Sequence, residues 1–160
     1  MLTRGMEMKT PYLHSAHLFA AGLMAAFASV TWAADPAGTV KTARGTVTVE
    51  RAGSKITATP GFKVMPADRV TTGVDSAVGI TLRDQTMLSA GPNASLTLDK
   101  YAFNSTTHEG EMRTSVQRGS LAVISGKLAK SSPDSVRFQT SSVTLGVRGT
   151  TFVIEAGEGN

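Results

Sequence analysis

The chain of 160 residues contains no cysteine, so it forms neither a disulfide nor a thiolate metal site. Histidine is also scarce, because only His108 lies beyond the first 33 residues. A serine–histidine–carboxylate set would have to use His108 beside Glu109, in a polar segment without a Gly-x-Ser-x-Gly motif. No glycine-rich phosphate loop or Asp-x-Asp-x-Asp calcium loop occurs. These absences predict a non-catalytic protein with no metal, no cofactor and no small-molecule substrate.

The sequence also has few of the residues that form aromatic stacking surfaces or basic patches for nucleic acid. Aromatic residues make up 6% of the chain, and Tyr101 is the one tyrosine after residue 33. Tyr101 and Phe103 share the parity of one strand face, where we expect both to cover a core rather than to stack on a sugar or base. After Ala33 the chain has 14 Lys and Arg and 11 Asp and Glu, a net charge of +3. These charges are scattered singly, which argues against nucleic acid as a partner.

The N-terminus has the layout of a signal helix. An uncharged, alanine-rich run from Leu18 to Val30 follows the basic residues Arg4 and Lys9, and small residues lead up to Ala33. Cleavage after Ala33 predicts export to the periplasm or the outside of a bacterial cell. The alternative is an uncleaved membrane anchor, because residues 15–34 approach the length of a transmembrane helix.

The rest of the chain has the pattern of short strands. Apolar and polar residues alternate in brief runs separated by glycine, proline, asparagine and aspartate, and no long helical pattern occurs. Ile80, Leu88 and Leu96 recur at a spacing of eight, which predicts that they are buried together. The spacing fits either an antiparallel meander or a coil that stacks on itself. We therefore expect an all-β single domain, either a twisted β-solenoid or sandwich-like, after the signal helix.

The segment from Ser142 to Ile154 changes the parity of its apolar residues. They occupy alternate positions from Val143 to Val147 and return on the opposite parity at Phe152. This pattern predicts one half-buried strand that bends at Gly149. Arg148 lies at the bend, where its guanidinium either clamps exposed backbone carbonyl groups or contacts a partner.

Short motifs along the chain resemble those of FecR-type domains in their order and spacing. They are Gly45-Thr46-Val47, Asp68 to Val70, Thr71 to Ser76, Leu82 to Thr86, Gly91-Pro92-Asn93, Arg118 to Leu121 and Gly146 to Thr150. The resemblance implies an all-β binding domain, with motif residues of structural importance at Gly73, Asp75, Asp84, Gly119, Gly146, Arg148, Gly149 and Thr150. It departs from the family at Gln85, where a glycine usually follows the turn aspartate, and at Thr140 to Ser142, where a Thr-Pro commonly leads into the last strand.

The expected organisation is a signal peptide over 1–33, a short entry segment over 34–44, a FecR-like domain over 45–155 and a tail over 156–160. FecR-type regulators carry a cytoplasmic anti-sigma segment and a transmembrane helix before this domain, and 33 residues are too few for both. The resemblance therefore implies only the periplasmic half of that role. It indicates a protein-binding module in periplasmic or cell-envelope signalling or assembly, with an envelope or outer-membrane protein as partner. A carbohydrate- or cell-wall-binding module is the alternative.

Overall fold

A computed structural model describes residues 34–147 and 151–157. The expected signal peptide lies outside the described residues, and so do Arg148, Gly149 and Thr150 at the expected bend. The description below concerns the compact unit that begins at Ala33.

Strands dominate the described part of the chain, which confirms the all-β class. The strands are β1 (Gly38–Arg44), β2 (Val47–Arg51), β3 (Ser54–Thr57), β4 (Lys63–Val64), β5 (Arg69–Thr72), β6 (Ala77–Leu82), β7 (Met87–Ala90), β8 (Ser95–Phe103), β9 (Gly110–Ile124), β10 (Val136–Gln139), β11 (Thr144–Gly146) and β12 (Thr151–Ala156). Between β9 and β10 the chain forms the short helix α1 (Lys127–Ser131) and the 3-10 turn η1 (Pro133–Ser135).

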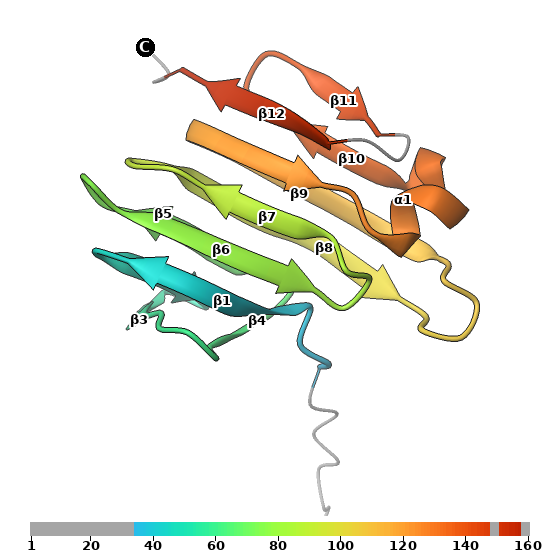
Figure 1. Cartoon of the computed structure of the whole chain (residues 1–160), viewed down its shortest axis with the longest axis horizontal. Helices are drawn as coiled ribbons and strands as arrows, with labels where there is room; N and C mark the ends of the chain where they lie inside the picture. The colour runs from blue at the N-terminus through green and yellow to red at the C-terminus, as the bar shows by residue number, and fades with distance from the viewer. Residues whose placement is uncertain (1–33, 148–150, 158–160) are drawn as a thin grey trace, which may run out of the picture. The chain divides into compact units, whose positions relative to one another are not determined.

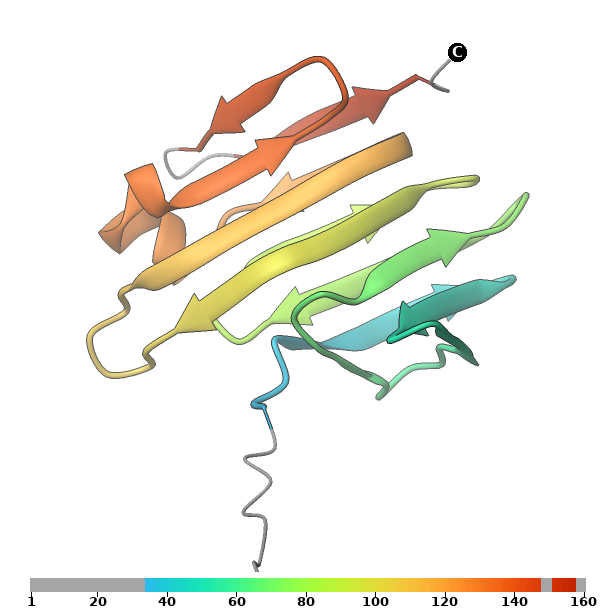
Figure 2. The same cartoon turned by 180° about the vertical axis from the view of Figure 1, so that it is seen from behind.

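The strands form one hydrogen-bonded network that is curled into two facing layers (Figures 1 and 2). The first layer has the order β4-β1-β6-β7-β9-β12 and the second the order β3-β2-β5-β8-β9-β10-β11. The long strand β9 belongs to both, because residues 110–118 pair with β8 and residues 119–124 pair with β12. Neighbouring strands are antiparallel, apart from the parallel pair β9 and β10.

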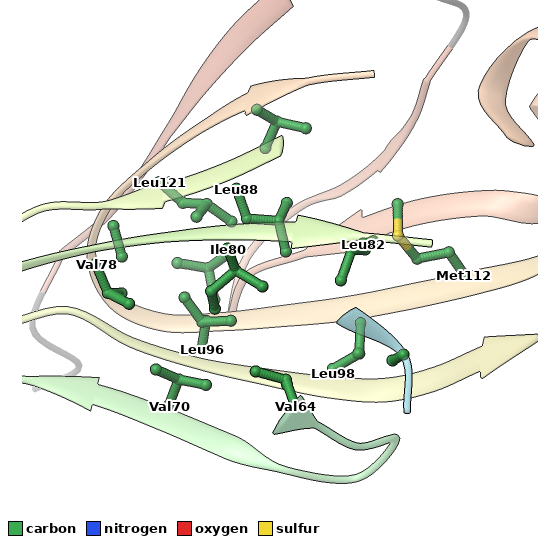
Figure 3. Close-up of a cluster of buried hydrophobic side chains, with 14 of the residues drawn as sticks. Val64, Val70, Val78, Ile80, Leu82, Leu88, Leu96, Leu98, Met112 and Leu121 are labelled. Carbon is green, nitrogen blue, oxygen red and sulfur yellow. The ribbon is translucent and has the colours of Figure 1, made fainter. Parts of the chain in front are cut away.

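The core lies between the two layers and contains the residues that recur at a spacing of eight. Ile80, Leu88 and Leu96 are all buried in one cluster, as expected (Figure 3). Ile80 is opposite Leu88 in the β6–β7 hairpin of the first layer, whereas Leu96 belongs to β8 in the second layer. The first interval of eight residues therefore spans the β6–β7 hairpin, as in a meander. The second interval spans the passage from the first layer to the second, as in a coil.

The crossing inside β9 depends on Gly119. Its φ of +80° lies in the left-handed region, which side chains other than glycine rarely adopt. A Cβ atom at this position would lie 2.6 Å from the Cα of Ala94, in the turn between β7 and β8. The bend thus needs glycine both for its backbone conformation and for the close approach of the neighbouring turn.

The N-terminal boundary of the fold differs from the expected one. Residues 38–44, expected to belong to an entry segment, form β1, which pairs with β4 and β6. Ala37 and Val40 are completely buried. The strand was missed because β1 is irregular, with a register shift between Val40 and Thr42, and because its second half is polar and exposed.

The expectation of one bent strand over 142–154 is wrong. This segment contains two strands, since β11 pairs with β10 and β12 pairs with β9. Val143 and Leu145 are not buried, with exposed fractions of 51% and 39%. Leu145 is opposite the buried Phe138 and so faces the interior, but β11 is the outermost strand of its layer among the described residues. The parity change therefore marks a passage from one layer to the other.

Candidate functional site

The buried carboxylate of Asp84 joins three parts of the fold. The Thr86 hydroxyl donates to Asp84 Oδ2 at 2.6 Å, and the Tyr101 hydroxyl donates to Oδ1 at 3.1 Å. The backbone N–H of Asp84 in turn donates to the Tyr101 oxygen at 2.9 Å. The N–H of Gly126, just before α1, donates to the Thr86 hydroxyl at 3.0 Å. This network links the β6–β7 turn, β8 and the start of α1.

The turn that holds Asp84 keeps a left-handed backbone without glycine. Gln85 has a φ of +71°, at the position where FecR-type domains usually have glycine. Its side chain is exposed, so the glutamine meets no steric conflict beyond its own backbone strain, of about 1 kcal/mol. Gln85 therefore adopts the left-handed conformation of this turn.

Burial raises the pKa of the Tyr101 phenol well above its ordinary value of 10.0, and the nearby charge of Asp84 raises it further. The folded state thus holds the phenol proton more tightly than the unfolded state does. The stability that the protonated Tyr101 phenol contributes to the fold is therefore complete below pH 10 and is lost as the pH rises above this value.

We expect the Tyr101→Phe variant to lose this alkaline sensitivity. At neutral pH the variant should unfold more easily by about 1–3 kcal/mol, because the buried Asp84 N–H and carboxylate lose a partner. Urea unfolding of both proteins from neutral pH to above pH 10 measures the difference. Identical slopes of stability against pH above 10 in the two proteins would contradict this account.

The other expected motif residues that the structure describes do not form one cluster with Asp84. Gly73 and Asp75 lie in the turn before β6, whereas Asp84 lies in the turn after it, at the opposite end of that strand. Gly73 is close to the bend at Gly119, because its carbonyl accepts the N–H of Asn93 in the turn that contacts Gly119. Gly146 is the last residue of β11, and a Cβ atom at this position would meet nothing within 4 Å. The two roles weighed for Arg148 stay predictions.

A second feature is an uncharged groove on the outer face of the first layer, with a volume of about 330 Å³. It is lined by Thr42, Ala77, Val78, Gly79, Ser89, Ala90, Gly91, Ser120, Ala122 and Val153. Three apolar side chains are exposed along this face: Met87 (43%), Ile124 (45%) and Val153 (62%). Met87 is opposite Ile124 across β7 and β9, and so the two extend a continuous apolar surface. We call this region the partner groove.

The outer face of the second layer is different in character. Lys100 and Arg113 both contact Glu111, at 2.6 Å and 3.3 Å, and the hydrogen bond from Lys100 holds the pKa of Glu111 below its ordinary value. Gln117 donates to the hydroxyl of Thr97 at 3.0 Å. Polar groups on this face thus pair with one another, whereas the partner groove offers apolar surface without charge.

Sequence reasoning did not identify the partner groove. The sequence signal for this groove is a set of small residues at alternate positions. They are Ala77 and Gly79, Ser89 and Gly91, and Ser120. The order of the strands, which brings these positions side by side, was not known from the sequence.

Among residues 34–147 and 151–157, no three His, Asp or Glu side chains are close enough to share a metal ion. His108 lies in the loop before β9, with its ring stacked on that of Phe103 at a centroid distance of 6.1 Å. Asp99 lies within β8 and accepts a hydrogen bond from Ser115. In this part of the chain we also find no helix with the length and apolar character needed to cross a membrane.

Comparison with known proteins supports the family resemblance. No curated protein and no solved structure shows significant similarity to the chain. The family model described as FecR protein matches residues 68–160, which is more than half of the chain and runs from just before β5 to the C-terminus. This family is related to signalling and is generally associated with the cell envelope. The chain belongs to the FecR protein family.

Proposed function

We propose that this protein is an exported, non-catalytic module that binds another protein of the cell envelope, in signalling or assembly. The observation that carries the proposal is the partner groove. Its lining has no charged side chain, and Met87, Ile124 and Val153 are exposed around it. An apolar surface of this kind, on a face bordered by polar groups, is typical of protein interaction sites.

The membership in an envelope-associated signalling family agrees with this proposal. The signal-peptide layout of residues 1–33 supports export, with Ala34 as the expected first residue of the mature chain. The proposed partner is a folded envelope or outer-membrane protein with a small apolar surface of its own.

Carbohydrate binding has less support in the structure. A sugar site of the common type needs an exposed aromatic ring. Within the described residues the aromatic side chains are buried or half-buried, and Tyr101 is used in the network with Asp84. We therefore favour a protein partner.

Site-specific photo-crosslinking in the native cell tests the proposal. A photoreactive amino acid at Ser89, which lies in the partner groove, is expected to capture one specific envelope protein. The control has the same amino acid at Thr57, an exposed position on β3 in the second layer. A second substitution, Ala122→Glu, places a charge in the groove and should abolish the product at Ser89. The proposal fails if Ser89 and Thr57 give the same products, or if Ala122→Glu has no effect on them.

A further inference from the structure

Strand β12 has an unpaired edge. Its residues pair with β9 on one side, from Thr151 opposite Ile124 to Ala156 opposite Gly119. On its other side, the described residues provide no backbone hydrogen bond. In a strand of six residues, alternate residues direct their N–H and C=O groups to the open side, so the edge is able to accept another strand.

The other outer strands are protected in ways that β12 is not. β4 has two residues, one of them Lys63, and β11 has three. β3 carries Lys55 and follows a tight turn at Ala52 and Gly53, both with positive φ. β12 is longer, contains no proline or lysine and pairs with β9 without a register shift. Glu155 is its one charged side chain, so the devices that usually prevent edge pairing are nearly absent.

The inner face of β12 is not completely covered, although Ile154 on it is buried. Phe152 of β12 is half-buried, and its ring meets that of Phe138 edge-on at a centroid distance of 5.2 Å. At the opposite end of the two layers, by contrast, the segment between β3 and β5 closes the interior. There Ala58 is buried, Phe62 packs against the core, and Arg51 binds the buried Asp68 with two hydrogen bonds of 2.8 Å.

We propose that the edge of β12 pairs with the β12 edge of a second copy of this chain, in antiparallel orientation, with a two-fold axis at Val153. In this register Val153 faces itself, Phe152 is opposite Ile154, and Thr151 is opposite Glu155. The two residues of each pair are both odd-numbered or both even-numbered, so their side chains lie on the same face of the sheet. The one acidic residue of the strand meets a threonine, so no like charges oppose each other.

A second copy fits this edge better than an unrelated strand does, because the edge is complementary to itself. Pairing joins two apolar residues, Phe152 and Ile154, on the inner face of the sheet. The first layers of the two copies then form one continuous sheet across the axis. Val153 also lines the partner groove, but the pairing depends on the backbone edge of β12 and not on what binds in the groove.

Sedimentation velocity of the purified protein over a range of concentrations tests the proposal. The wild type is expected to dimerise reversibly. Val153→Lys and Val153→Glu each place two like charges on the axis and should raise the dimer dissociation constant by about tenfold or more. An equal mixture of the two variants should dimerise again, because lysine then faces glutamate. Val74→Lys, at an exposed position in the turn before β6, is the control and should dimerise like the wild type.

Cysteine variants test the register in the same protein, which has no cysteine of its own. Under mild oxidation Val153→Cys is expected to form a disulfide between two copies, whereas Thr151→Cys is not, since Glu155 faces it. A wild type that stays monomeric at its highest soluble concentration would overturn the proposal and leave the edge to a strand of another protein. A dimer that is unaffected by Val153→Lys would also overturn it, because another surface would then form the interface.

Discussion

Replacement of Leu88 by aspartate is expected to unfold the domain. Leu88 lies in the middle of the core, opposite Ile80 and facing Leu96 of the second layer (Figure 3). A carboxylate there would be buried without a partner, at a cost of about 3–5 kcal/mol, which is a large part of the stability of a domain of this size. Circular dichroism at room temperature, followed by urea unfolding of whatever folded fraction remains, measures the effect.

The neighbouring residue provides a matched control for Leu88. Met87 is on the same strand and points to the solvent, so Met87→Asp introduces the same side chain one position away. This variant should change the free energy of unfolding by no more than about 0.5 kcal/mol. If both variants melt like the wild type, the core does not contain Leu88 and the expected role of the spacing of eight is wrong.

Gly119→Ala is the second substitution with a large expected effect. The methyl group would force a left-handed backbone on alanine and would collide with the backbone of Ala94, 2.6 Å from its Cα. The sum of strain and displaced packing is expected to lower the free energy of unfolding by about 3 kcal/mol or more. Thermal and urea unfolding of the purified variant measure it.

Gly53→Ala separates the two causes of this effect. Gly53 has the same φ of +80° in the turn between β2 and β3, but a Cβ atom there meets nothing within 4 Å. We expect a loss of about 1 kcal/mol, from backbone strain alone. Equal losses in the two variants would show that the approach of Ala94 does not matter and that the bend in β9 has room to adjust.

The sequence predicted the features of this fold that depend on nearby residues. Alternation and turn residues indicated short strands, and the spacing of Ile80, Leu88 and Leu96 correctly indicated that they are buried together. Gly119 was expected to be structurally important, and its left-handed backbone lies where β9 passes between the layers. These features are local because each follows from strand periodicity or from the conformational freedom of one glycine.

The features that depend on distant residues were not predictable in this way. Residues 142–154 have the alternation of one strand, and only their pairing with two different strands, β10 and β9, shows that they are two. The partner groove exists because β6, β7, β9 and β12 lie side by side, an order that periodicity does not contain. The role of Asp84 depends in the same way on Tyr101 and Gly126, which are far from it in sequence.

The membership of β9 in both layers has a consequence for how the chain folds. Strands β7 and β8 both pair with β9, and β10 and β12 are added to its other side later in the chain. Until residues 110–124 are in place, β7 in the first layer and β8 in the second each have an additional open edge, and β10 and β12 lack the strand with which they pair. Loop closure over such distances is slow, and the unpaired strands are exposed to aggregation in the meantime. Folding is therefore expected to be a single late event, in which the arrival of one strand completes both layers.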